Sequence, residues 1–162
     1  MIKLSTSACI EASTDTVWAL LANLENIHAW VEPIISSHCT GEKSRGIGAT
    51  RVCNLSGGIS VTEEWTAWDD GRSFEYIASG MPLVKRATNR WVLHPHGNQT
   101  LVVSHAEITL KGGALAKLLE PAMRRAIKTM GPRSLAAFKY LVEHGVPYQG
   151  KHNELALAPV AC

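Results

Sequence analysis

The alternation of apolar and polar residues divides the chain into three parts, and the first begins with a strand. Apolar residues alternate with polar ones over residues 2–10, which predicts a β-strand. Ser13 follows, a residue type typical of a helix N-cap. Apolar residues then recur at helical spacing: Val17, Leu20, Leu21 and Leu24. We expect a helix there and a second short helix over residues 26–30, ending before Pro33.

The middle and the end of the chain differ in period. From about residue 35 to residue 110 the period is two, with turn signals about every ten residues, which predicts a meander of five or six antiparallel strands. The last third has period 3.6 and predicts a long helix. Because Pro121 and Pro132 interrupt it, we expect a short helical turn followed by a long helix kinked near Pro132. The order predicts an α+β domain over 1–146 and an extended tail over 147–162.

The hairpin around residues 56–58 can be registered from its turn. A three-residue turn places Leu55 opposite Ile59 and Arg51 opposite Glu63. Side chains two residues apart share one face of a strand, so Arg51 and Glu63 belong to the apolar face. We therefore predict an Arg51–Glu63 ion pair on the inner face of the sheet.

The next hairpin extends this register. A two-residue turn at residues 70–71 pairs Ala67 with Phe74 and Trp65 with Tyr76. The inner face is then aromatic and aliphatic, and small residues leave space beside large ones. Such a face is typical of a ligand cavity with a few polar groups, and equally of a filled core with a structural ion pair.

Under the cavity interpretation, one set of side chains would contact a ligand. Its members before the last helix are Trp30, Arg51, Glu63, Trp65, Phe74, Tyr76, Trp91, Ser104 and Ile108, and its members on that helix are Met123, Ile127 and Met130. We expect a ligand to pass between the last helix and the loop at residues 80–82, which the prolines would permit by weakening the helix. The alternative is that the prolines only bend the helix to follow the sheet.

Composition and charge exclude several classes of protein. The 162 residues are 46% hydrophobic and 19% charged, which excludes a disordered chain and a coiled coil. A net charge of +2 does not indicate a nucleic-acid partner. The basic face of the last helix is expected to be solvated rather than bound to a membrane. No apolar run is long enough to span a bilayer, and residues 1–6 lack the pattern of an export signal.

The cysteines and histidines do not form a metal-binding pattern. Cys9, Cys39, Cys53 and Cys162 are scattered without a C-x-x-C spacing, which argues against zinc and predicts reduced thiols in a cytoplasmic protein. The seven histidines do not cluster with carboxylates. We expect no metal and no cofactor, and we find neither a nucleophile elbow nor a phosphate-binding glycine loop.

A series of short motifs occurs in order along residues 3–144. They are Ile10–Ser13, Val17–Leu21, Gly48–Arg51, Val61–Trp65, Met81–Leu83 and Trp91–Pro95, followed by the long last helix. In order and spacing the chain resembles the START-like, Bet v 1-type superfamily (SRPBCC), and within it the polyketide cyclase/dehydrase and lipid-transport group. The resemblance implies a helix-grip fold: a curved antiparallel sheet of six to seven strands around a long C-terminal helix and an elongated cavity. Many relatives have a large aromatic residue where this chain has Ser104, which implies a differently shaped cavity here.

The resemblance leaves two functions open, because the superfamily includes carriers, hormone receptors and cyclases. The first is the binding of a hydrophobic small molecule: a lipid, a polyketide or another aromatic metabolite. The alternative is a polyketide cyclase or dehydratase in which Arg51, Glu63 and Tyr76 handle protons or an enolate. Glu63 would act as a general base only if burial raised its pKa, and the neighbouring Arg51 opposes that by favouring the carboxylate. The sequence does not decide whether the protein forms a homodimer.

Overall fold

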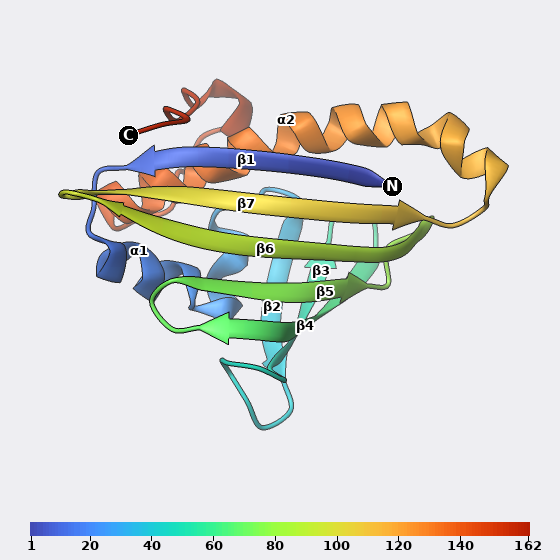
Figure 1. Cartoon of the computed structure of the whole chain (residues 1–162), viewed down its shortest axis with the longest axis horizontal. Coiled ribbons are helices and arrows are strands. Elements are labelled where there is room, and N and C mark those ends of the chain that lie inside the picture. Colours follow the sequence, from blue (N-terminus) through green and yellow to red (C-terminus); the bar gives the residue numbers. More distant parts are fainter.

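A curved antiparallel sheet packs against one long helix in the computed structural model (Figure 1). The structure describes residues 1–162 apart from the side chain of Leu115. Over the described residues the sheet has seven strands in the order β1-β7-β6-β5-β4-β3-β2. The strands are β1 (Ile2–Ile10), β2 (Ile34–Thr40), β3 (Thr50–Leu55), β4 (Ile59–Asp69), β5 (Ser73–Ser79), β6 (Val84–His96) and β7 (Gln99–Leu110). The helices are α1 (Thr14–Leu21), η1 (Leu24–Ala29), α2 (Ala114–His144) and η2 (His152–Glu154), so the α+β helix-grip fold is confirmed.

The two helices after β1 form as the sequence predicts. Ser13 caps α1, its Oγ accepting a hydrogen bond from the Thr16 backbone N–H at 3.4 Å. The helix buries Val17 and Trp18 against the sheet. The 3₁₀ helix η1 follows and begins two residues before the predicted start.

The register of β3 with β4 is as predicted. Leu55 lies opposite Ile59 and Arg51 lies opposite Glu63. The three-residue turn at 56–58 therefore sets which side chains of both strands face inward.

The register of β4 with β5 is right at one end and wrong at the other. Trp65 pairs with Tyr76 as predicted, but Phe74 pairs with Trp68 instead of Ala67. The connection has one more residue than a two-residue turn, and a β-bulge between Trp65 and Ala67 compensates for it. The bulge leaves Ala67 exposed and brings Trp68 onto Phe74, their ring centroids 5.4 Å apart.

Helix α2 is continuous over 31 residues, with Pro121 and Pro132 inside it, so the separate helical turn predicted before Pro121 is wrong. Each proline removes one backbone hydrogen bond to the residue four positions earlier. Those residues, Lys117 and Lys128, are exposed, so water can bind their carbonyl oxygens. The helix ends at His144 and is capped by Gly145, whose φ of 74° is the left-handed conformation that glycine adopts readily.

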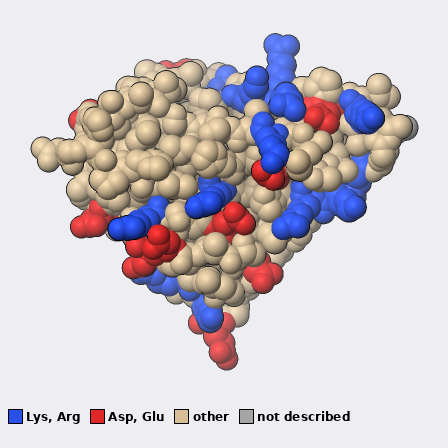
Figure 2. Space-filling model, in the orientation of Figure 1, with Lys and Arg blue, Asp and Glu red and all other residues tan. Residues whose placement is uncertain are grey.

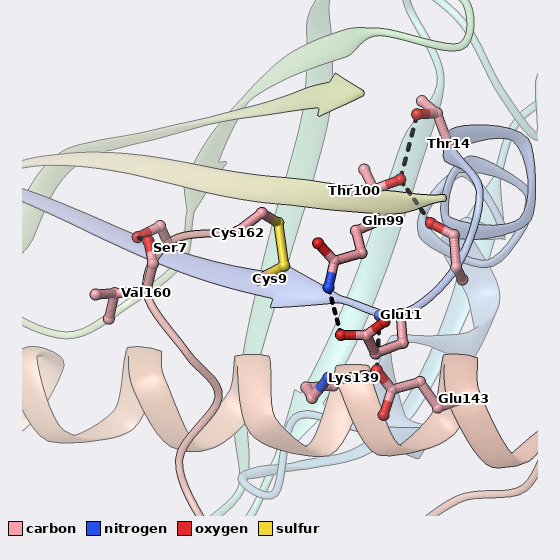
Figure 3. Close-up of a disulfide and its surroundings, with 11 residues drawn as sticks. Ser7, Cys9, Glu11, Thr14, Gln99, Thr100, Lys139, Glu143, Val160 and Cys162 are labelled. Carbon is pink, nitrogen blue, oxygen red and sulfur yellow. Dashed lines mark hydrogen bonds and ion pairs between the residues drawn. A yellow bond between two sulfur atoms is a disulfide. The ribbon is translucent and has the colours of Figure 1, made fainter. Parts of the chain in front are cut away.

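The C-terminal tail is extended apart from η2 and is attached to the outer edge of β1 (Figure 3). The backbone N–H of Cys9 donates to the Pro159 carbonyl at 2.7 Å, and Ser7 Oγ donates to the Val160 carbonyl at 2.7 Å. A disulfide joins Cys9 to Cys162, their Cα atoms 5.1 Å apart. The tail thus covers a strand edge that would otherwise be unpaired.

The disulfide corrects the prediction of reduced thiols, which holds only for Cys39 and Cys53. Cys9 and Cys162 are 153 residues apart, so their spacing gave no sign of the pairing. Disulfides persist mainly in oxidising compartments, so cysteine usage no longer supports a cytoplasmic location.

None of the described helices has the length and apolar character needed to cross a membrane.

Candidate functional site

A cavity of about 450 Å³ lies between the inner face of the sheet and α2. Its size is within the range of small-molecule sites, about 300–1,000 Å³. Side chains from all seven strands, η1 and α2 contribute to its wall. The apolar part of this wall includes Ile27, Trp30, Val61, Met81, Trp91, Ile108, Met123, Ile127 and Met130.

Most of the residues predicted to contact a ligand lie around this cavity. They are Trp30, Glu63, Tyr76, Trp91, Ser104, Ile108, Met123, Ile127 and Met130. Arg51, Trp65 and Phe74 are buried but are not part of the wall. Met81 and Pro82 also line the cavity, which places the loop of the predicted access route beside it.

Trp65 and Phe74 lie outside the wall because α1 fills their end of the sheet. The ring of Trp18, from α1, lies 5.7 Å from Phe74 and 5.3 Å from Trp68, between centroids. Trp65 packs edge-on against Phe74 at 5.8 Å. The predicted lining by Trp65 and Phe74 is therefore wrong: their side chains point inward, but an aromatic cluster occupies the space in front of them.

Arg51 and Glu63 form the predicted ion pair on the inner face. The guanidinium donates to Glu63 Oε2 from Nε at 2.8 Å and from Nη2, while Nη1 donates to the Leu24 carbonyl at 2.6 Å. The side chains are only 4% and 9% exposed. Burial acts to lower the pKa of Arg51, but the Glu63 carboxylate, with smaller contributions from Cys53 and Tyr76, holds this pKa above its usual value. Arg51 therefore supports the cavity wall as a permanent cation behind Glu63.

Glu63 contributes the charged group of the wall itself. Among the described residues, its hydrogen bonds all end on Oε2, including a weak one from Cys53 Sγ at 3.5 Å. Burial, followed by the Glu63 charge, raises the pKa of Cys53 to about 12, so the thiol keeps its proton at neutral pH. Oε1 is left without a described protein partner and can accept a hydrogen bond from a ligand.

Tyr76, Asn89 and Ser104 extend this polar part of the wall from strand to strand. Ser104 Oγ donates to Asn89 Oδ1 at 2.8 Å, and Asn89 Nδ2 donates to the Tyr76 hydroxyl at 3.2 Å. Burial, together with the Glu63 charge, raises the pKa of Tyr76, so its hydroxyl stays neutral and can donate to a carbonyl. With Glu63 these residues form what we call the polar strip.

Sequence reasoning missed Asn89, although a signal for it existed. Asn89 lies two residues before Trp91 and so shares its face, and Trp91 pairs with Ser104 across β6 and β7. The polar strip contains hydrogen-bond donors and acceptors rather than metal ligands. In the described part of the chain, no group of three or more His, Cys, Asp or Glu side chains is arranged to hold a metal ion.

Solved structures share this fold at low sequence identity. The Zhui aromatase/cyclase from a Streptomyces species is 17% identical, with a TM-score of 0.68 over 89% of this chain and 92% of that chain. A protein from Thermus thermophilus is 18% identical, with a TM-score of 0.72 over 89% and 99% of the two chains. Ara h 8.0201 is 12% identical, with a TM-score of 0.65 over 88% and 98%.

The sequence itself also matches a family. No curated protein sequence matches the chain. The family described as polyketide cyclase / dehydrase and lipid transport matches residues 1–143, which include every described strand and nearly all of α2. The protein therefore belongs to the polyketide cyclase/dehydrase and lipid transport family.

Proposed function

We propose that the protein binds a hydrophobic small molecule, such as a lipid, a polyketide or another aromatic metabolite, in the cavity between the sheet and α2. The observation that carries this proposal is the cavity of about 450 Å³, with an apolar wall and a single polar strip. An apolar wall binds a ligand by removing its surface from water, and a few polar groups orient it. Family membership supports the same function, since the family description includes lipid transport.

Binding explains the polar strip better than catalysis does. A general base must be free to reach the proton that it takes, and Glu63 Oε2 already accepts hydrogen bonds from the Arg51 guanidinium. Arg51 is behind the wall, so it cannot touch a bound molecule. The Tyr76 hydroxyl and Glu63 Oε1 are then recognition groups, a donor for a ligand carbonyl and an acceptor for a ligand hydroxyl.

Tyr76 is the residue that favours the alternative function, a polyketide cyclase or dehydratase. A neutral, buried hydroxyl on the cavity wall could donate to an enolate oxygen as charge develops on it. If the protein is an enzyme, Tyr76→Phe should abolish turnover of a poly-β-keto substrate without preventing its binding. A variant that binds and turns over like the native protein would remove Tyr76 from any catalytic role.

The test of binding uses the intact protein. Native mass spectrometry of freshly purified protein should show a co-purifying small molecule. Fatty acids, flavonoids and polyketide-like aromatics should change the fluorescence of Trp30 and Trp91, which line the cavity, and raise the melting temperature.

A matched pair of variants identifies the site. Ser104→Phe places an aromatic ring in the cavity and should weaken binding at least about tenfold, because the ring occupies the ligand's volume. Thr62→Phe adds a similar ring on the exposed face of β4 and should leave binding unchanged. A panel that changes neither fluorescence nor melting temperature would refute the proposal.

A further inference from the structure

A second pocket adjoins the cavity, between α2, the segment before β2 and the C-terminal tail. Its volume is about 560 Å³, and it shares Pro33, Met130 and Ser134 with the cavity wall. The two spaces are therefore adjacent, and these residues lie between them, where η1 leads into β2 and α2 passes over the sheet. We call this second space the outer pocket.

The outer pocket is basic where the cavity is apolar. Arg125 and Arg133 line it from α2, eight residues apart, and the buried His152 lines it from the C-terminal tail. Neither arginine forms an ion pair with a described carboxylate, whereas the neighbouring Arg124 pairs with Glu120. Figure 2 shows basic side chains gathered on the side of the molecule where the first half of α2 lies.

From this juxtaposition we propose that the natural ligand is an amphipathic acid, whose apolar body fills the cavity and whose carboxylate or phosphate lies in the outer pocket between Arg125 and Arg133. The inference rests on the proposed function and names the chemical class of the ligand. A guanidinium binds carboxylate and phosphate oxygens through paired N–H groups, and its bonds to an anion are stronger than those to a neutral group. Glu32 also lines the pocket, but it supplies one negative charge against two guanidinium groups.

The site also has a hydroxyl group at the boundary of the two spaces. Ser134 lies in both linings, so its hydroxyl can contact a ligand where the apolar body ends and the acidic group begins. Met130, unbranched and adaptable, lies at the same boundary and can move to let an alkyl chain pass. A neutral ligand of the same shape would fill the cavity equally well but leave both arginines without a partner.

The test compares ligands that differ only in the end group. Dodecanoate, dodecyl phosphate and 1-dodecanol are titrated into the full-length protein with its disulfide intact, and binding is followed by tryptophan fluorescence and calorimetry. We expect the native protein to bind dodecanoate or dodecyl phosphate about tenfold more tightly than 1-dodecanol. The ratio between the two acids shows which anionic group the pocket prefers.

Two double variants show whether the outer pocket causes the preference for the acid over 1-dodecanol. Arg125→Gln with Arg133→Gln should abolish the preference for the acid while leaving 1-dodecanol binding unchanged, and that unchanged binding shows that the variant is folded. Lys117→Gln with Lys128→Gln removes the same charge from exposed positions of α2 outside both linings, and should retain the preference. An equal loss in both double variants would mean that net charge, not the pocket, attracts the acid, and would overturn the inference.

Two binding results distinguish an error in the class of ligand from an error in the proposed binding function. Equal affinity of the native protein for dodecanoate, dodecyl phosphate and 1-dodecanol overturns the amphipathic acid and leaves the apolar cavity as the binding site. No binding of any of the three, and none of the wider panel, overturns both.

Discussion

The two ends of the inner sheet face carry similar side chains, but one end is filled and the other is hollow. At the filled end, Trp18 from α1 packs against Phe74 and Trp68 with ring centroids less than 6 Å apart. At the hollow end, the first half of α2 presents Met123 and Ile127 across a cavity of about 450 Å³. The difference lies in the covering helix: α1 fills its end with a large aromatic ring, and the first half of α2 does not.

The same contrast occurs within α2 itself. Leu135, Phe138 and Leu141 in its second half are 0–4% exposed, whereas Leu118 in its first half is 79% exposed. Between the two halves, Gly131 passes so close to β1 that an added Cβ would lie 2.9 Å from Thr6 Oγ1. The helix therefore contacts β1 at Gly131, packs closely around Phe138 and Leu141, and covers an open space at Met123 and Ile127.

The largest effect should come from the ion pair between the two ends. Arg51→Met or Glu63→Leu each leaves the partner's charge unpaired in a buried site and should cost about 3–5 kcal/mol of unfolding free energy. The double variant Arg51→Met with Glu63→Leu should cost much less than the sum of the single variants. Urea unfolding of the full cycle measures the coupling, and additive effects would show that the pair is not a unit.

The next largest effect on unfolding free energy should come from truncating a side chain in the second half of α2, compared with a similar truncation in the first half. Leu141→Ala removes a fully packed side chain and should cost about 2–5 kcal/mol. Ile127→Ala enlarges a space that already exists, so it should cost about 1 kcal/mol and change ligand affinity instead. Equal losses of stability in urea unfolding would mean that the first half of α2 is as well packed as the second.

Loss of the disulfide should have a smaller effect than the larger core truncations. Cys162→Ser removes the covalent link between the tail and β1 and should lower the unfolding free energy by about 2–4 kcal/mol in a buffer without reductant. Cys39→Ser changes a half-exposed free thiol and serves as the control, with little expected loss. In a reducing buffer the native protein and Cys162→Ser should unfold at the same urea concentration, and a remaining difference would point to a role of Cys162 other than the disulfide.

The smallest effect tests the contact at which α2 approaches β1. Gly131→Ala should cost about 1 kcal/mol, because its Cβ displaces Thr6 while alanine favours the helix. In a Thr6→Ala background the same substitution should be neutral or stabilising. Thermal unfolding of the four proteins measures this, and an unchanged cost in that background would show that Thr6 is not the obstacle.

Much of the candidate site could be predicted, because side-chain direction follows from local spacing. Strand alternation and one turn length placed Arg51 opposite Glu63 and Trp91 on the face of Ser104. Helical spacing placed Met123, Ile127 and Met130 toward the sheet, where they line the cavity. Asn89 was missed although the same parity rule applied to it.

Contacts between segments that are distant in the chain could not be predicted from the sequence. The bulge after Trp65 changes the face of every later residue in β4, and the pairing of Cys9 with Cys162 joins segments 153 residues apart.

The sequence by itself thus determined the order of the elements, the inner face of most strands and the ion pair. Tertiary structure alone decided which inward-facing side chains meet a cavity: Trp65 and Tyr76 are paired neighbours on one face, yet only Tyr76 lines it. The physical reason is that alternation sets the direction of a side chain, whereas the space in front of it depends on how closely a distant helix approaches the sheet.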